Sequence, residues 1–383
     1  MSNIDKNQYI PSQVSPPGET LLETIETLGI SQAELAEKMG RPKKTINEII
    51  KGKAAITPET ALQLERVLGV PAGFWNNRER HYREALAQEE EKKCLKDQTN
   101  WLQRLPVKDM AKKGWIREFK DEVQQIKEVL SFFGVASPAP WERSIIRYRQ
   151  QQVTFQRSAA FKENPGAVAA WLRKGEIEAQ SIECEPYDAN KFNQNLIEIR
   201  QLTNKQPGDF LRELVRFGAS AGVAVAFVPE LPQTRTGSAT RWLNSQKALI
   251  QLSFRYKFND QFWFTFFHES AHILLHGKTH FILEGSGSKD QKEIGADRFA
   301  EKSLIPEREL RGFIAREKFD EKAIERFALE IGIAPGIVVG RLQHGGVLPR
   351  NRWNHLKIRF NWNASLYEHK DNGARTAPKE ATS

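Results

Sequence analysis

Two histidines and a glutamate occur in the pattern His268-Glu269-x-x-His272, within a run of apolar residues. On an α-helix, side chains four residues apart share one face, so the two imidazoles can hold one metal ion. Glu269 is rotated around the helix from His268, where its carboxylate can reach a water molecule on the metal. A match of this length also arises by chance, and a histidine in a core is usually just hydrogen-bonded. The pattern alone therefore leaves open whether these residues bind a metal or are hydrogen-bonded core residues.

Two acidic residues further along the chain supply what the first motif lacks. Glu293 begins 21 residues after His272 and, with Asp297, opens another helical pattern that Pro306 ends. A catalytic zinc ion takes three protein ligands and leaves one position for water, so His268, His272 and Glu293 would complete the set. Asp297, one turn beyond Glu293, is placed to accept a ring N–H from a ligand histidine. The alternative for Asp297 is a charge on the helix surface.

The residues around the first motif predict a buried helix over residues 262–276. Four phenylalanines precede the motif, and Ala271, Leu274 and Leu275 fill the turns around and after it. Such a helix, apolar nearly all round, belongs to a core, where imidazoles and carboxylates need partners to offset their desolvation. Glu269 is expected to act as the general base on a water activated by zinc. The sequence does not identify the group that stabilises the oxyanion. The candidates are His276, His280, Arg241 and Tyr256, and for each of them a structural role is the alternative.

Together the two motifs resemble a known family. His268-Glu269-x-x-His272-x-x-x-His276, followed by Glu293-x-x-Ala-Asp-x-Phe-Ala300, resembles the ImmA/IrrE family of metallo-endopeptidases, and the resemblance covers about residues 210–360. It implies an α+β, zincin-like (gluzincin-like) metallopeptidase domain with Zn²⁺ as its cofactor. It also implies a cytoplasmic protein of bacterial or mobile-element origin, whose protein substrate is a repressor or another regulatory protein.

Near the N-terminus, a compact helical pattern indicates a second functional unit. Ser31 and Glu34 form a capping box before one short helix, which Gly40 closes, and Pro42 starts the next helix. Two short helices joined by a tight turn containing glycine predict a helix-turn-helix, whose second helix enters the major groove of DNA with its N-terminal residues at the base edges.

Positive charge is concentrated on this turn and on the second helix. From Lys38 to Lys53 the chain has six basic residues (Lys38, Arg41, Lys43, Lys44, Lys51 and Lys53) and one acidic residue, Glu48. A basic edge of this kind is expected where a protein contacts phosphates, although a solvated face of a helical interaction domain is the alternative. The predicted DNA-contacting residues are Arg41, Lys43, Lys44, Thr45, Asn47 and Lys51.

Several short segments of this unit are similar to the HigA-type antitoxin branch of the XRE-family DNA-binding domains. These segments are Ser31-Gln-x-Glu-Leu-Ala36, residues 56–62 and Leu68-Gly-Val-Pro-x-x-Phe-Trp75, and the similarity covers about residues 15–85. It implies a homodimer that binds a palindromic double-stranded DNA operator. It also supports a rival to proteolysis, in which the chain is an antitoxin-like repressor whose second domain only binds a partner or senses a signal.

Composition sets broad limits on the protein. With 383 residues, 39% hydrophobic, the chain is long enough for two or three domains. The net charge of +9 permits nucleic-acid binding without demanding it. Cys94 and Cys184 are far apart and fit a reducing cytoplasm. No apolar run is long enough to span a bilayer, so no membrane association is expected.

The fold class expected is multidomain and mainly α, with a small β-sheet. Strands are predicted over residues 221–228, 238–243 and 247–254, and one of them is expected to form a free edge beside the metal helix, where an extended peptide can pair. Aromatic and basic residues alternate over 141–171, which indicates either a core stripe or contact with single-stranded nucleic acid. The predicted segments are a flexible arm (1–17), the helix-turn-helix domain (18–80), a helical linker and middle region (81–209), the zincin-like domain with a C-terminal helical subdomain (210–360) and a disordered tail (361–383).

Overall fold

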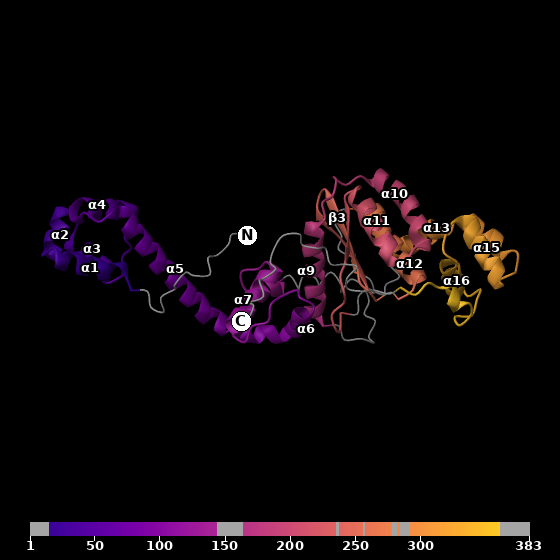
Figure 1. The fold of residues 1–383 in the computed structure, drawn as a ribbon, viewed down its shortest axis with the longest axis horizontal. Coiled ribbons are helices and arrows are strands. Elements are labelled where there is room, and N and C mark those ends of the chain that lie inside the picture. Colours follow the sequence, from indigo (N-terminus) through magenta and orange to yellow (C-terminus); the bar gives the residue numbers. More distant parts are fainter. Residues whose placement is uncertain are drawn as a thin grey trace, which may run out of the picture. The chain divides into compact units, whose positions relative to one another are not determined.

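The computed structural model describes residues 15–143, 164–234, 237–255, 257–277, 282–283 and 291–360. The chain divides into two compact units, Met1–Thr99 and Asn100–Ser383 (Figure 1). The predicted arm lies almost wholly outside the described residues, and the predicted tail lies wholly outside them. The same is true of most of the aromatic and basic stretch considered for single-stranded nucleic acid.

Over its described residues, 15–99, the first unit has five helices: α1 (Pro17–Thr27), α2 (Gln32–Lys38), α3 (Lys43–Ile50), α4 (Pro58–Leu68) and α5 (Ala72–Lys96). The predicted capping box is present, since the Ser31 hydroxyl accepts from the Glu34 amide and the Glu34 carboxylate accepts from the Ser31 amide. Pro42 is the N-cap of α3 rather than its first residue. Leu21, Ile46 and Trp75 are fully buried in a core shared by the first four helices and the start of α5.

Helix α5 continues without a break past residue 80, where the sequence predicts the first domain to end. Ala72 and Trp75 near its start and Leu95 near its end are buried, whereas nearly all residues from 84 to 94 are exposed. Strong helix formers such as Glu, Lys, Ala and Gln keep an exposed segment of this kind helical. The compact units divide after Thr99, beyond the end of this helix.

The second unit begins with helices that the sequence assigns to a middle region. They are η1 (Thr99–Arg104), α6 (Val107–Lys112), α7 (Glu122–Phe133), α9 (Pro165–Ser181), α10 (Ala189–Gln201) and η2 (Leu202–Asn204). Helix α9 packs on the sheet: the Trp171 indole donates to the Val228 carbonyl at 2.9 Å, and the Gln251 amide donates to the Trp171 carbonyl at 2.7 Å. Part of the predicted middle region therefore belongs to the core of the second unit.

The sheet has four strands in the order β1-β3-β2-β4. They are β1 (Val223–Phe227), β2 (Ser238–Asn244), β3 (Lys247–Leu252) and β4 (Ile282–Leu283). Strand β3 is parallel to β1 and antiparallel to β2. The prediction of a free edge in residues 238–254 is wrong for the first part of β2, because Ala239 and Thr240 pair with β4.

Helix α12 (Asn259–Leu275) is the central helix of this unit, as its apolar sequence predicts. Phe262, Trp263, Phe266 and Phe267 are fully buried, whereas Leu275, which the sequence predicts to fill a turn, is 53% exposed where the helix ends. Helices α13 (Gln291–Leu304) and α16 (Pro335–His344) lie against α12. The same hydrophobic core includes residues of α11 (Pro207–Ala219), α14 (Glu307–Ile314), α15 (Glu321–Ile331) and η3 (Asn354–Leu356).

The predicted C-terminal helical subdomain contains a break between α15 and α16. Helix α15 ends at Gly332, which adopts a left-handed conformation, and α16 starts at Pro335. Proline at the first position of a helix loses no hydrogen bond, because the N–H group at that position has no partner within the helix. Within the described residues, no helix is both long and apolar enough to cross a membrane.

The close packing of α11 on β1 gives a test of the fold. A Cβ added at Gly218 would lie 2.6 Å from the Val223 carbonyl oxygen and 2.9 Å from a Val225 methyl. Gly218→Ala is therefore expected to lower the free energy of unfolding by about 1–3 kcal/mol, as overpacked cores do. Urea denaturation followed by tryptophan fluorescence measures it.

A matched control for this substitution is Gly312→Ala. Gly312 lies in α14 with no atom within 4 Å of the added Cβ. There the loss of backbone freedom in the unfolded chain is expected to raise stability by roughly 0.5–1 kcal/mol. Equal effects of the two substitutions would contradict the close approach of α11 to β1.

Candidate metal centre and DNA-facing helix

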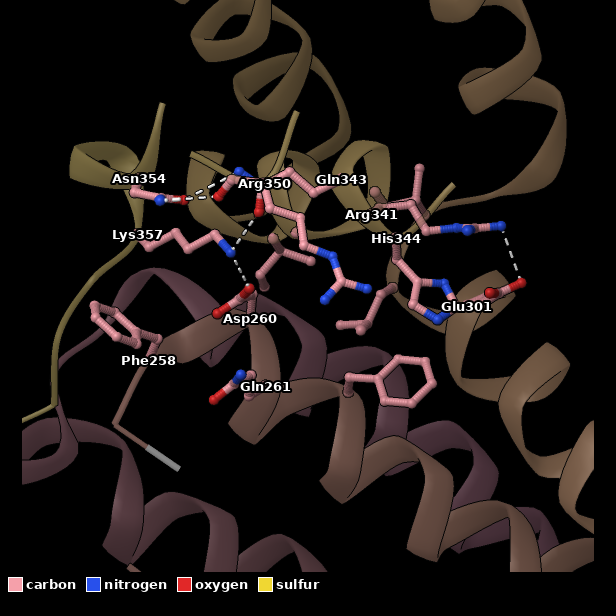
Figure 2. Close-up of a pocket in the computed structure, with 15 residues that line it drawn as sticks. Phe258, Asp260, Gln261, Glu301, Arg341, Gln343, His344, Arg350, Asn354 and Lys357 are labelled. Carbon is pink, nitrogen blue, oxygen red and sulfur yellow. Dashed lines mark hydrogen bonds and ion pairs between the residues drawn. The ribbon is translucent and has the colours of Figure 1, made fainter. Parts of the chain in front are cut away.

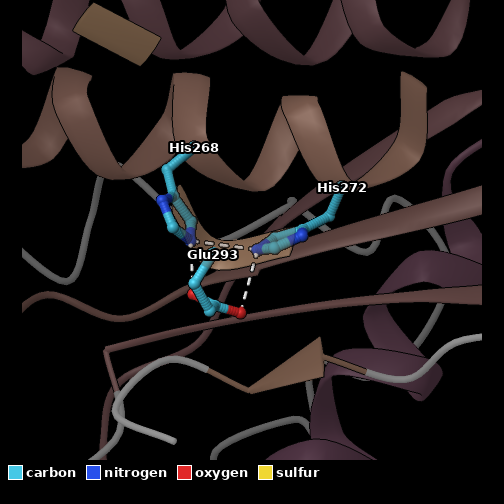
Figure 3. A group of neighbouring side chains, drawn as sticks. All are labelled: His268, His272 and Glu293. Atoms are coloured by element: carbon cyan, nitrogen blue, oxygen red, sulfur yellow. Dashed lines mark hydrogen bonds and ion pairs between the residues drawn. The ribbon is translucent and has the colours of Figure 1, made fainter. Parts of the chain in front are cut away.

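Helices α12 and α13 bring together the three side chains predicted as metal ligands. One donor atom from each of His268, His272 and Glu293 lies within 4.8 Å of the others (Figure 3). The two Nε2 atoms are 3.0 Å apart, and the Glu293 carboxylate oxygens lie 3.2 Å from that of His268 and 3.6 Å from that of His272. The two histidines come from one face of α12, and Glu293 comes from the first turn of α13.

The other ring nitrogens of the two histidines are also hydrogen-bonded. His268 Nδ1 lies 2.8 Å from an Asp297 carboxylate oxygen, so the carboxylate accepts the ring N–H. His272 Nδ1 lies 2.8 Å from Nδ1 of His276, and one of these two nitrogens donates to the other. The structure therefore places His276, considered above as an oxyanion donor, against the back of His272. Such contacts fix the orientation of a ring and leave its Nε2 free to bind a metal.

The two imidazoles have opposite protonation preferences. Burial alone lowers the pKa of His268, but the hydrogen bonds to Asp297 and Glu293 and the charges of Glu269 and Glu293 raise it to about 10. Burial, together with the positive charges of His268 and His276, lowers the pKa of His272 well below its ordinary value. Near neutral pH, His268 thus carries a proton on both ring nitrogens while His272 is neutral. The Nε2 atom of His268 faces the space where a cation would lie.

Glu269 is fully buried and held by two hydroxyl groups of strand β2. The Ser238 hydroxyl donates to one carboxylate oxygen at 2.6 Å, and the Thr240 hydroxyl donates to the other. Neither residue is among the site residues predicted from the sequence. Their spacing in the sequence indicates that the two hydroxyl groups lie side by side, because residues two apart on a strand point to the same face.

Arg241, His280 and Tyr256 are the remaining oxyanion candidates. Arg241 follows Thr240 on β2 and points to the opposite face, where its guanidinium pairs with Glu176 at 2.5 Å and donates to the Leu172 carbonyl at 2.8 Å. Its role is therefore to tie α9 to the sheet. His280 and Tyr256 lie outside the described residues.

In the first unit, the residues predicted to contact DNA gather at the start and end of α3. Lys43, Lys44 and Lys51 are exposed, and Thr45 and Asn47 are half-buried. Arg41 donates to the Gln63 side chain of α4 at 2.6 Å, so its guanidinium is held beside the N-terminus of α3. The Lys44 ammonium lies 3.9 Å from the Glu48 carboxylate, an ion pair between exposed groups that leaves the lysine accessible.

Comparison with known proteins identifies the class of the first unit. Residues 21–75 match the family model described as helix-turn-helix. The virulence-associated protein I of Dichelobacter nodosus is 35% identical over 75 residues, which are 19% of this chain and 69% of that protein. Through this N-terminal domain, the chain belongs to the helix-turn-helix family.

Other relatives match the same domain. An uncharacterized HTH-type transcriptional regulator of Escherichia coli K12, YddM, is 36% identical over 61 residues, which are 16% of this chain and 65% of that protein. The virulence-associated protein A of Dichelobacter nodosus is 40% identical over 52 residues, and the chain spans 51% of its length. Among solved structures, a Pseudomonas aeruginosa antitoxin HigA with the higBA promoter is 30% identical, with 22% of this chain and 91% of that chain covered and a TM-score of 0.21.

The protonation of the histidine pair predicts how metal binding depends on pH. Because the pKa of His268 is about 10, its proton is present at pH 7 and must leave when a cation takes its place. Zinc uptake by the metal-free protein is expected to release about one proton per ion. The affinity rises with pH until His268 has lost its proton.

Isothermal titration calorimetry in buffers of different ionisation enthalpy measures the proton release. Asp297→Asn removes a carboxylate that raises the pKa of His268, so this variant is expected to release fewer protons at the same pH. Binding heats that do not vary with the buffer would contradict the release of a proton from His268.

Proposed function

We propose that the protein is a DNA-binding transcriptional regulator that carries a zinc-dependent endopeptidase in its second unit. The single observation that supports the peptidase is the convergence of two imidazoles and a carboxylate beside a buried glutamate, Glu269. Its substrate would be a repressor or another regulatory protein. The first unit would direct it to DNA.

The donor set fits zinc better than a hard cation. Two imidazole nitrogens and one carboxylate oxygen are the ligands of catalytic zinc sites that keep an open position, whereas calcium and magnesium prefer oxygen alone. His268 Nε2, His272 Nε2 and the Glu293 carboxylate would hold the ion. Asp297 and His276 would fix the two rings from behind.

The chemistry then follows from the residues around the site. Bound zinc supplies Lewis acidity to a peptide carbonyl and to a water molecule. Glu269 would accept the proton of that water and pass it to the leaving amine. The Ser238 and Thr240 hydroxyls would fix the carboxylate of Glu269 while it does so. The buried surroundings of α12 exclude bulk water and strengthen these interactions.

A second candidate function is a regulator whose second unit binds a partner without cleaving it. One observation favours it: both carboxylate oxygens of Glu269 already accept hydroxyl groups, as in a structural hydrogen-bond network. Turnover separates the two candidates, because a binding module would hold zinc and still leave every protein intact.

DNA binding by the first unit is supported by its family and by its surface. The chain belongs to the helix-turn-helix family, and one relative is described as a transcriptional regulator. Exposed lysines stand at both ends of α3, the second helix of the motif, where they can reach phosphates. A dimer on a palindromic operator in the cytoplasm is the corresponding proposal for its assembly and location.

The peptidase is tested by Glu269→Gln. The amide keeps the shape of the side chain but cannot accept a proton from water, so zinc is expected to stay bound while cleavage falls by about 100-fold or more. Metal analysis and a comparison of cellular proteomes expressing each form measure the two effects. A protein that disappears only with the wild type is the substrate.

Controls separate loss of metal from loss of chemistry. His272→Ala is expected to lose both zinc and cleavage, since it removes a ligand. Proteomes that are identical with the wild type and with Glu269→Gln, at full zinc content, would reject the peptidase in favour of the binding module.

DNA binding is tested on a labelled duplex of random sequence. Lys43→Ala and Lys44→Ala together are expected to lower the slope of log affinity against log salt by about 0.9 for each phosphate that is no longer neutralised. Lys93→Ala, which changes an exposed lysine on α5 of the same unit, serves as the matched control and should leave the slope unchanged. Equal slopes for all forms would place the DNA-binding surface elsewhere.

A further inference from the structure

A pocket of about 480 Å³ lies between α12, α13, α16 and the segment that follows α16 (Figure 2). This volume falls within the range of sites that enclose a small ligand or a few residues of a peptide. Buried Leu304, Ile305 and Ile337 and half-buried Phe258 and Phe264 give it an apolar lining.

The charges around this pocket do not cancel. Asp260 pairs with Lys357 at 2.7 Å, and Glu301 pairs with Arg341 at 3.0 Å. The third cation, Arg350, has no carboxylate partner among the described residues. Figure 2 shows its guanidinium in the middle of the pocket, between the two ion pairs. The pocket therefore combines apolar walls with one guanidinium free to bind an anionic group, for which its planar fork of donors is suited.

The pocket and the candidate metal group, which is His268, His272 and Glu293, share the same two helices. Phe264 lines the pocket one turn before His268, and the centroids of their rings are 6.2 Å apart. On α13, Glu301 lies eight residues after Glu293, which is about 12 Å along a helix. An extended polypeptide advances about 3.3–3.6 Å per residue. A chain with one carbonyl at the metal group thus reaches the pocket within about three or four residues.

We propose that this pocket recognises the substrate of the endopeptidase. Arg350 binds an acidic side chain of the substrate, and Phe264 contacts an apolar residue next to it. The acidic residue lies about three or four residues from the cleaved bond. The assignment rests on the proposed peptidase function, and it adds the chemical class of the segment that the peptidase selects.

The first test measures binding without turnover. The full-length chain with Glu269→Gln is loaded with zinc, immobilised and incubated with a library of random short peptides, and the retained peptides are sequenced by mass spectrometry. Peptides with Asp or Glu beside an apolar residue are expected to be enriched. Adding Arg350→Glu should lower that enrichment about tenfold, as removal of a charge-assisted hydrogen bond does, and favour Lys or Arg instead.

A matched control is Arg308→Glu on α14. Arg308 and Arg350 are both exposed, but Arg308 does not line the pocket, so the same charge change there should leave the selection unaltered. Retained selection of acidic peptides by the Arg350→Glu form, or an equal change with Arg308→Glu, would overturn the assignment.

The second test uses wild-type, zinc-loaded protein on the same library. Cleaved peptides are expected to carry the acidic residue at one fixed distance from the new terminus. Cleavage without such a position overturns the pocket assignment and leaves the peptidase standing. Selection of acidic peptides by the Glu269→Gln form, with no cleavage of any peptide by the wild type, rejects the peptidase and retains the pocket as a peptide-binding site.

Discussion

The burial of two imidazoles and one carboxylate on α12 is the constraint on which the rest of the second unit depends. His268, His272 and Glu269 lie in a helix whose other buried residues are mainly large and apolar. Buried polar groups are tolerated only when hydrogen-bonded or paired. Here each has a partner on another element or on the next turn, so the surrounding helices and β2 must take up one relative arrangement.

Strand β2 shows how a single element meets two demands. One of its faces presents the Ser238 and Thr240 hydroxyls to Glu269 on α12. The other face presents Arg241, whose ion pair with Glu176 anchors α9. Alternation along a strand separates the two tasks at adjacent positions. Helix α9 is therefore part of the support of the site, although it precedes the first strand in the chain by many residues.

The two helices that carry the metal group also form the walls of the neighbouring pocket. The metal group uses the second half of α12, with His268 and His272, and the first turn of α13, with Glu293. The pocket uses the first half of α12, with Asp260 and Phe264, and the second half of α13, with Glu301. This antiparallel arrangement places a charged, apolar-walled recess about two turns from the metal group.

Local sequence determined the elements and the candidate chemistry. The helical spacing of His268 and His272, the capping box at Ser31 and the short apolar runs of the strands are signals that span few residues. Only the tertiary structure decided which distant groups meet. It paired Glu269 with hydroxyls about 30 positions earlier in the chain, turned Arg241 away from the site, covered part of β2 with β4 and placed Arg350 in the same pocket as Phe264. These contacts depend on how whole elements pack, and no local period encodes that packing.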